Sequence, residues 1–139
     1  MKIRLDKDVL AEAVAWAARS LPVRPSVPIL AGLLVRATGG EVVMSSFDYE
    51  TSAQITVKAD VVDDGVALVS GRLLADIARA LPNKPVEITA DESRMELVCG
   101  TARFTLQTLP VADYPSLPAM PEATGTIASD DFAKAVGQV

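Results

Sequence analysis

The sequence predicts an α+β fold in which two helices lie on one side of an antiparallel β-sheet. Apolar side chains recur with helical spacing in two stretches, about residues 7–20 and 72–80. The rest of the first 107 residues alternates apolar and polar side chains in short runs that are separated by turn residues, as in antiparallel strands. A parallel βαβ sheet, or strands at either helical stretch, would contradict this prediction.

The composition is that of one globular domain. The chain has 139 residues, of which 50% are hydrophobic and 22% charged, which excludes a disordered chain and suffices for one core. Aromatic residues make up only 4%, so aliphatic side chains must build that core. The net charge of −5 argues against a protein that binds nucleic acid through an extensively basic surface.

Several kinds of site are excluded by missing residue types. The sequence has no histidine, which excludes Ser-His-Asp and Cys-His catalytic sites and histidine-ligated metals. The single cysteine, Cys99, cannot form an internal disulfide and is expected to be a small core residue. No apolar run is long enough to span a membrane and the first residues do not resemble a signal peptide, so a cytoplasmic protein without cofactor or metal is expected.

The first helix is expected to follow a short strand near the N-terminus. Either Asp6 or Asp8 can cap it, because a carboxylate accepts hydrogen bonds from the free backbone N–H groups of the first turn. Its apolar stripe contains Leu10, Ala13, Val14, Ala17 and Leu21. Trp16 lies on another stripe, and the pattern leaves open whether it packs under a neighbouring element or stays partly exposed.

The segment of residues 24–30 takes the chain out of this helix. Pro25 and Pro28 fix their own φ angles and keep the residues before them out of the α region. The apolar run of residues 29–35 then predicts a buried strand. Arg24 is either a solvated loop arginine or a phosphate contact, since an arginine on a stiff loop is a good anion donor.

The remaining elements alternate strands and turns around the second helix. Further strands are expected at residues 41–46, 52–59, 66–69, 86–90, 94–99 and 102–107. Ser70 is the expected N-cap of the second helix. Arg72, Asp76 and Arg79 share one face of that helix, which on its own is typical of a solvated, ion-paired surface.

After residue 108 the chain changes character. Four prolines predict a stiff, extended linker over residues 109–122. The stretch 130–136 then resembles residues 8–14, with Phe132 in the place of Leu10. A repeated unit is one interpretation, and two unrelated capped helices are the alternative. We expect one complete domain, residues 1–120, and the truncated start of a second, residues 121–139.

Three motifs together resemble the bacterial DNA polymerase III β subunit, the sliding clamp. They are residues 24–30 (RPSVPIL), 47–50 (FDYE) and 109–118 (LPVADYPSLP), and their order along the whole chain makes the match specific. The alanine-rich first helix and the sequence pI of about 4.6 are similar to those of actinobacterial members. The resemblance implies a DNA clamp (processivity-fold) domain.

The resemblance implies a role in DNA replication without chemistry. Family members close head to tail as homodimers of three-domain subunits, with helices on the inner wall of a ring around duplex DNA. The ring tethers the replicative polymerase and is not an enzyme. Because containment is topological, an acidic chain fits this role. The polymerase III α subunit and the clamp loader would bind a pocket between the second and third domains, outside this chain.

The resemblance also assigns site residues. Arg24 matches the DNA-contacting arginine of the hinge and Arg72 a second basic position, while helix faces add Lys7, Arg19 and Arg79 as further DNA-binding candidates. The matching positions of the subunit interface are Leu73, Ile77, Arg94, Arg103 and Phe104. Leu73 and Thr101 stand where some relatives carry basic residues, so a smaller ionic share is expected at this interface.

Two other classes of function are weighed on the residues alone. An enzyme is disfavoured because the carboxylates fall in turn-like clusters without a histidine, a phosphate-binding loop or metal-ligand spacing. A β-rich protein-interaction module without DNA contact is the alternative to a clamp. The clamp requires its five basic candidates on one concave face, and the module does not.

Overall fold

The computed structural model describes residues 1–22, 24, 27–48, 51–115 and 124–137. In this part of the chain the elements are, in order, β1 (Lys2–Leu5), α1 (Lys7–Ala18), η1 (Pro28–Ala31), β2 (Gly32–Thr38), β3 (Glu41–Phe47), β4 (Ser52–Lys58), β5 (Asp60–Asp63), β6 (Gly65–Ser70), α2 (Gly71–Ala80), β7 (Val86–Ala90), β8 (Arg94–Cys99), β9 (Ala102–Leu109), η2 (Val111–Asp113) and α3 (Ser129–Gly137). The two η elements are short 3₁₀ helices.

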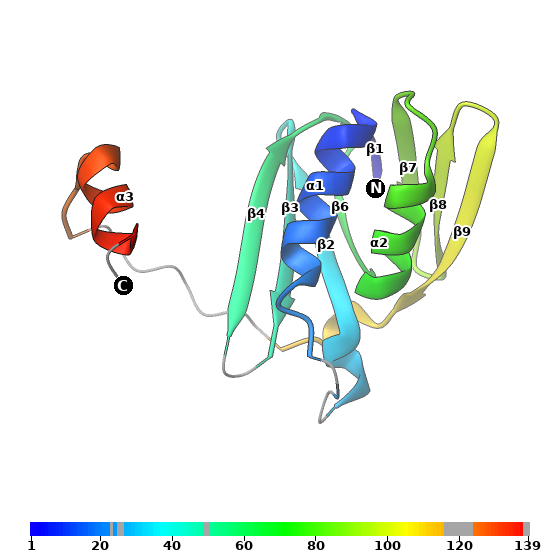
Figure 1. Cartoon of the computed structure of the whole chain (residues 1–139). Helices are drawn as coiled ribbons and strands as arrows, with labels where there is room; N and C mark the ends of the chain where they lie inside the picture. Colours follow the sequence, from blue (N-terminus) through cyan, green and yellow to red (C-terminus); the bar gives the residue numbers. More distant parts are fainter. Residues whose placement is uncertain (23, 25–26, 49–50, 116–123, 138–139) are drawn as a thin grey trace.

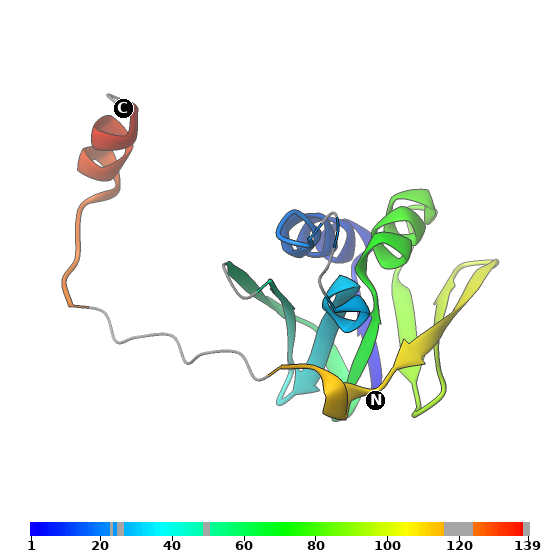
Figure 2. The same cartoon turned by 90° about the horizontal axis from the view of Figure 1, so that it is seen from below.

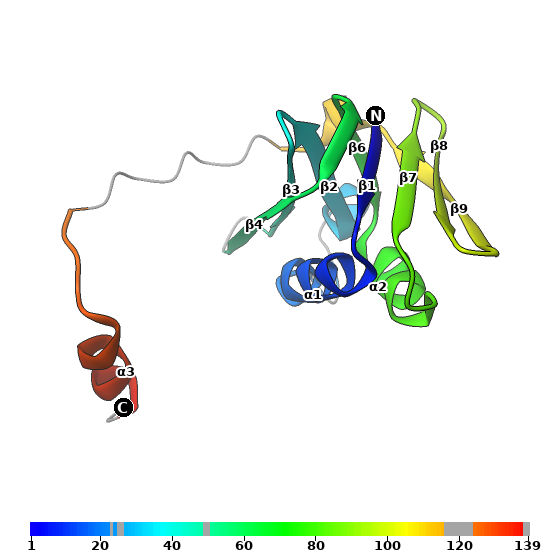
Figure 3. The same ribbon diagram turned by 90° about the horizontal axis from the view of Figure 1, so that it is seen from above.

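The nine strands form one antiparallel sheet with the order β4-β3-β2-β6-β9-β8-β7-β1-β5. The join between β6 and β9 is short, since only Leu68 with Leu109 and Val69 with Thr108 are paired there. Helices α1 and α2 lie side by side against one side of this sheet (Figures 1 and 3). The predicted α+β arrangement, with two helices on one side of antiparallel strands, is confirmed.

The two halves of the sheet repeat one plan. β1-α1-β2-β3-β4 and β6-α2-β7-β8-β9 each place a helix after their first strand and then three strands in sequence. Each half also lends its first strand to the other, because β6 pairs with β2 and β1 pairs with β7. This exchange ties the halves together and sets the two helices beside each other.

Helix α1 forms where the sequence predicts it and ends two residues earlier. Asp6 is the N-cap, and its side chain accepts a hydrogen bond of 2.8 Å from the backbone N–H of Asp8. The buried positions are Leu10, Ala13, Val14 and Ala17. At the other end the Ser46 hydroxyl on β3 donates a buried hydrogen bond of 2.9 Å to the carbonyl of Ala17. This bond adds to the one of 3.4 Å that the same carbonyl accepts from the backbone N–H of Ser20, so the helix end is tied to the sheet.

The core is aliphatic and lies between the two helices and the sheet (Figure 2). Cys99 is fully buried there, as predicted, and its Sγ lies 3.2 Å from the carbonyl oxygens of both Pro82 and Lys84, which share its single S–H donor. These contacts hold the loop after α2 against β8. Gly39 and Gly40, with φ of 57° and 85°, make the turn between β2 and β3.

The strand predicted over residues 29–35 begins later than expected. Residues Pro28–Ala31 form the 3₁₀ helix η1, and β2 begins at Gly32. Pro28 has the φ of a first helical residue, and the N–H of Leu30 donates to the carbonyl of Val27 at 3.0 Å, so the turn closes locally. Leu30 is nevertheless fully buried, which explains its apolar character. Pro25 and Ser26 lie outside the described residues.

The structure departs from the sequence-based expectations at two other places. The strand β5, Asp60–Asp63, was not predicted, because a four-residue run with two carboxylates has little strand character of its own, yet it pairs with β1. The linker does not begin at residue 109. Leu109 belongs to β9, and η2 leads to Tyr114, which is 8% exposed. Residues 116–123 of the predicted linker lie outside the described residues.

Candidate nucleic-acid interface

A groove of about 450 Å³ runs between α1 and α2. It is lined by Ala15, Ala18, Arg19, Arg72, Ala75, Asp76 and Arg79. The three guanidinium groups outnumber the one carboxylate, whereas the chain as a whole has a net charge of −5. The groove is therefore a local basic surface on an acidic protein, and it lies on the helix side of the sheet.

The guanidinium groups of the groove are not equally available. Arg79 pairs with Asp76 one helical turn before it, and both side chains are largely exposed, so solvent screens the pair. Among the residues that the structure describes, no carboxylate lies within 4.0 Å of the side chains of Arg19 or Arg72. These two arginines are the groups of the groove that are best placed to meet an anion.

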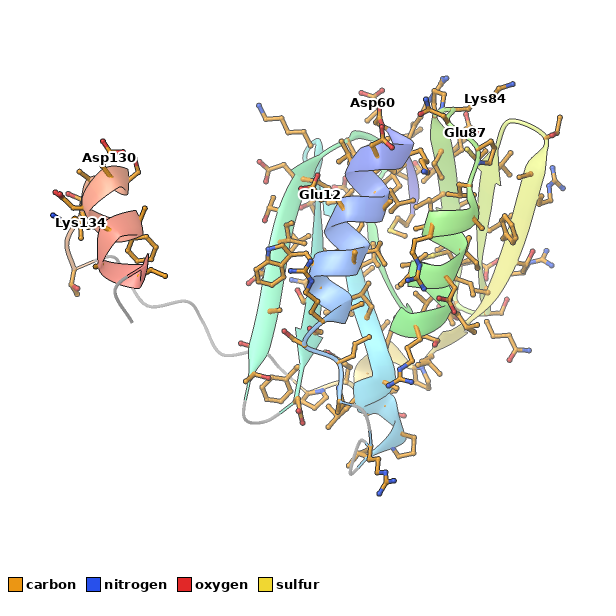
Figure 4. All side chains as sticks on the ribbon, viewed as in Figure 1. Glu12, Asp60, Lys84, Glu87, Asp130 and Lys134 are labelled. Carbon is orange, nitrogen blue, oxygen red and sulfur yellow. The ribbon has the colours of Figure 1, made fainter. Side chains whose placement is uncertain are left out.

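The other two basic candidates do not line this groove. Lys7 begins α1, at the end opposite Arg19, and its Nζ lies 3.9 Å from Oδ1 of Asp8. Arg24 is exposed in the segment that follows α1. Figure 4 also shows Glu12 on the outer surface of α1, where its carboxylate weakens the positive field along the helix. The structure thus gathers three of the five predicted basic residues around one groove.

The sequence analysis did not identify the three alanines of the groove as site residues. Ala15 and Ala18 come from α1 and Ala75 from α2. Small side chains leave the space between the helices open and let the longer arginine side chains stand along its rim. A signal was available, since both predicted helices carry alanine on a polar face, but only the packing of the two helices brings these faces together.

The predicted subunit-interface residues fall on two faces of the sheet. Leu73 on α2 is 53% exposed, and Ile77 and Phe104 are half-buried against the core beside it. Arg94 and Arg103 are exposed, and they alternate with inward-facing residues of β8 and β9, so they lie on the opposite face. The Nε of Arg103 lies 3.5 Å from Oε1 of Glu96.

The strand next to these residues has an open edge. β9 pairs with β8 over residues 102–107, whereas only Thr108 and Leu109 pair with β6. Within the part of the chain that the structure describes, the other edge of residues 102–107 has no partner strand. An open strand edge beside apolar side chains is suited to pairing with another chain.

Two shifted pKa values lie away from the groove. Asp91 accepts hydrogen bonds from the backbone N–H groups of Ser93 and Arg94, and these bonds lower the pKa of its carboxyl. The same bonds stabilise the turn between β7 and β8. Burial raises the pKa of Tyr114 to about 12, with the backbone of Phe47 lowering it by a smaller amount. Both groups are held by contacts within the fold and lie outside the groove. The groove is therefore identified as a candidate site by its charge and its shape.

Two other kinds of site are absent from the described residues. Within residues 1–22, 24, 27–48, 51–115 and 124–137, no three Cys, Asp or Glu side chains are grouped so that they could hold a metal ion. None of the helices in the same ranges is long and apolar enough to cross a membrane.

Comparison with known proteins relates the chain to one family. The model of the family described as "DNA polymerase III beta subunit, N-terminal domain" matches residues 1–118. Over all 139 residues the chain is 64% identical to the beta sliding clamp of Streptomyces coelicolor and 50% identical to that of Micrococcus luteus. The matches span 37% and 45% of those two relatives, so this chain covers less than half of their length.

Solved structures agree with this relation. The DNA polymerase III subunit beta of Pseudomonas aeruginosa superposes with a TM-score of 0.88 at 26% identity, over 99% of this chain and 38% of that one. A sliding clamp from Bartonella birtlesii, solved bound to griselimycin, gives a TM-score of 0.80 at 32% identity, over 86% of this chain and 33% of that one.

Proposed function

The chain belongs to the family of the DNA polymerase III beta subunit, N-terminal domain, and from this membership we propose that it is part of a DNA sliding clamp. Such a clamp encircles duplex DNA as a ring and tethers the replicative polymerase. The observation that carries the proposal is the arginine-lined groove between α1 and α2 on an otherwise acidic protein. A β-rich module that never meets DNA would not need this local basic surface.

In this proposal the groove meets the phosphate backbone weakly. Arg19 and Arg72 line it, and Arg24 lies just beyond α1. One exposed arginine–phosphate contact contributes on the order of 1 kcal/mol and weakens as salt rises. A few such contacts centre the duplex without holding it in one register. Retention then comes from closure of the ring, and the clamp carries out no chemical step.

The domain arrangement is also a proposal. Residues 1–120 make one clamp domain, and residues 121–139 begin the next. Its support is the helix α3, in which Phe132 and Val136 are each 58% exposed although they match Leu10 and Val14, which are fully buried in α1. A helix with this apolar face needs a sheet of its own to cover it.

The assembly we propose is a head-to-tail homodimer of longer subunits. The α2/β9 end, with Leu73, Ile77 and Phe104 beside the open edge of β9, receives the second subunit, and Arg94 and Arg103 lie on the outer face of the same end. The polymerase III α subunit and the clamp loader bind elsewhere, in a pocket outside this chain. The cytoplasm is the compartment in which such a ring works.

A retention assay on nicked circular DNA tests the proposal in the full-length protein. Loaded protein should stay on the circle and be lost when the circle is linearised. Replacing Arg24, Arg19 or Arg72 with Ala should reduce loading or retention and leave the dimer intact. Arg36→Ala is the matched control, because Arg36 is an exposed arginine on β2 between two inward-facing residues and so points away from the helices. Retention that survives linearisation would refute a topological clamp.

A further inference from the structure

Asp76 interrupts the arginines of the groove between α1 and α2. Of the described residues that line this groove, it alone carries a carboxylate, whereas Arg19, Arg72 and Arg79 carry guanidinium groups. On α2, Asp76 lies four residues after Arg72 and three residues before Arg79. Residues with these spacings are neighbours on one helix face, so the carboxylate stands between two of the three cations.

The carboxylate of Asp76 is bonded to one of these two cations. Its Oδ1 accepts a hydrogen bond from Nη2 of Arg79. Among the residues that the structure describes, neither Arg72 nor Arg19 has a carboxylate within 4.0 Å of its side chain. Two guanidinium groups of the groove are therefore open to an anion, while the third already has a partner.

The pair of Asp76 and Arg79 is placed where another anion can compete for the arginine. The side chains of Arg79 and Asp76 are 71% and 64% exposed, so water screens the pair and a phosphate group can reach it. The helix does not depend on Asp76 to hold Arg79. Arg79 belongs to the last turn of α2, where the free carbonyl groups of the helix end already favour a positive charge. What Asp76 changes is the availability of Arg79 to a ligand in the groove.

We propose that Asp76 limits how tightly this groove binds DNA, by occupying Arg79 and by repelling phosphate from it. The proposal rests on the sliding-clamp function proposed above. A ring that moves along DNA must break its phosphate contacts at each step, so each further arginine–phosphate contact slows the movement. Each such contact also releases counterions and steepens the logarithmic salt dependence of binding by about 0.9. Asp76 withholds the third arginine of the groove from these contacts and so favours movement over tight binding.

Asp76→Asn tests this role in the 139-residue chain, because it removes the charge and keeps the size of the side chain. Binding to a labelled linear duplex would be measured by fluorescence anisotropy from low ionic strength upward. We expect the logarithmic salt slope to steepen by about 0.9 and the affinity at low salt to rise severalfold. Combining Asp76→Asn with Arg79→Ala should return the slope to that of the wild-type chain, because the released guanidinium group is then missing.

Glu87→Gln is the matched control for the change in net charge. Glu87 is an exposed residue of β7 between two buried ones, so its side chain lies on the face of the sheet away from the helices (Figure 4). Its substitution should leave the salt slope as in the wild-type chain. Equal slopes for Asp76→Asn and Glu87→Gln would overturn the proposal, because the position of the carboxylate would then have no effect. A double variant that keeps the steeper slope would overturn it too, since Arg79 would not be the released group.

The full-length protein gives a second readout that depends on movement. Single labelled rings would be tracked on a stretched duplex with blocked ends. At low salt, rings with Asp76→Asn should diffuse severalfold more slowly than wild-type rings, and the difference should close as salt rises. Equal diffusion at low salt, in a protein that is still lost from circular DNA on linearisation, would refute the role of Asp76 alone. Retention that survives linearisation would instead refute the clamp function.

Discussion

Ser46 shows how a single side chain can join the two layers of this fold. Its hydroxyl, fully buried on β3, donates to the carbonyl of Ala17 in the last turn of α1. This bond is shorter than the one of 3.4 Å that the same carbonyl accepts from the backbone N–H of Ser20, so the end of the helix is stabilised in part by a strand that is distant in sequence.

Ser46→Ala should therefore lower the free energy of unfolding by about 1 kcal/mol, because it removes a buried hydrogen bond and leaves the Ala17 carbonyl with only the weaker backbone donors of the helix end. Chemical denaturation of the 139-residue chain measures this loss. Ser52→Ala is the control, since Ser52 is exposed on β4 and the change there should stay within about 0.5 kcal/mol. Equal effects of the two substitutions would show that the buried hydrogen bond has no special weight.

Tyr114 holds the chain after β9 against the domain, and its burial predicts a pH dependence. Its pKa is raised from 10.0 to about 12 in the folded state. The unfolded state therefore ionises first, and the stability contributed by the neutral phenol is full below pH 10 and lost between about pH 10 and pH 12. Denaturation midpoints across this range should fall more steeply for the wild-type chain than for Tyr114→Phe. Parallel curves would mean that the phenol is not buried as described.

At the scale of elements, the α2/β9 end makes a prediction about assembly. In the full-length protein, Ile77→Asp should shift the dimer toward monomer, because it places a charge among the apolar side chains of this end. Sedimentation measures the shift. Ile77 also packs against the core, so Leu73→Asp, at a more exposed position, serves as the second variant. Thr89→Asp, on the exposed face of β7, is the control. A dimer that resists both interface variants would place the interface elsewhere.

For the whole molecule, the net charge of −5 and the small basic groove predict weak binding to DNA that is not encircled. The isolated 139-residue chain should bind linear duplex poorly. Its affinity should fall with salt with a logarithmic slope no steeper than about −3, as expected for contacts by Arg19, Arg24 and Arg72. Fluorescence anisotropy with a labelled duplex at rising salt measures both quantities. Tight, salt-resistant binding would count against retention by ring closure.

Much of this protein was determined by the sequence alone. Both main helices, the cap at Ser70, the buried Cys99 and the antiparallel strands follow from local patterns, because apolar periodicity and capping act over a few residues. The first cap was narrowed to Asp6 or Asp8, and the structure selects Asp6. The relation to sliding clamps likewise followed from three short motifs, and the family match over residues 1–118 bears it out.

Only the tertiary structure decided how these parts meet. The strand β5 exists because β1 offers it a partner, and Leu30 is buried by packing around a 3₁₀ turn, so neither could be identified from its own segment. The groove needs α1 and α2 side by side, and this brings Arg19 near Arg72 while leaving Lys7 at the far end of its helix. Long-range pairing of strands sets these distances, and no periodicity within one segment encodes them.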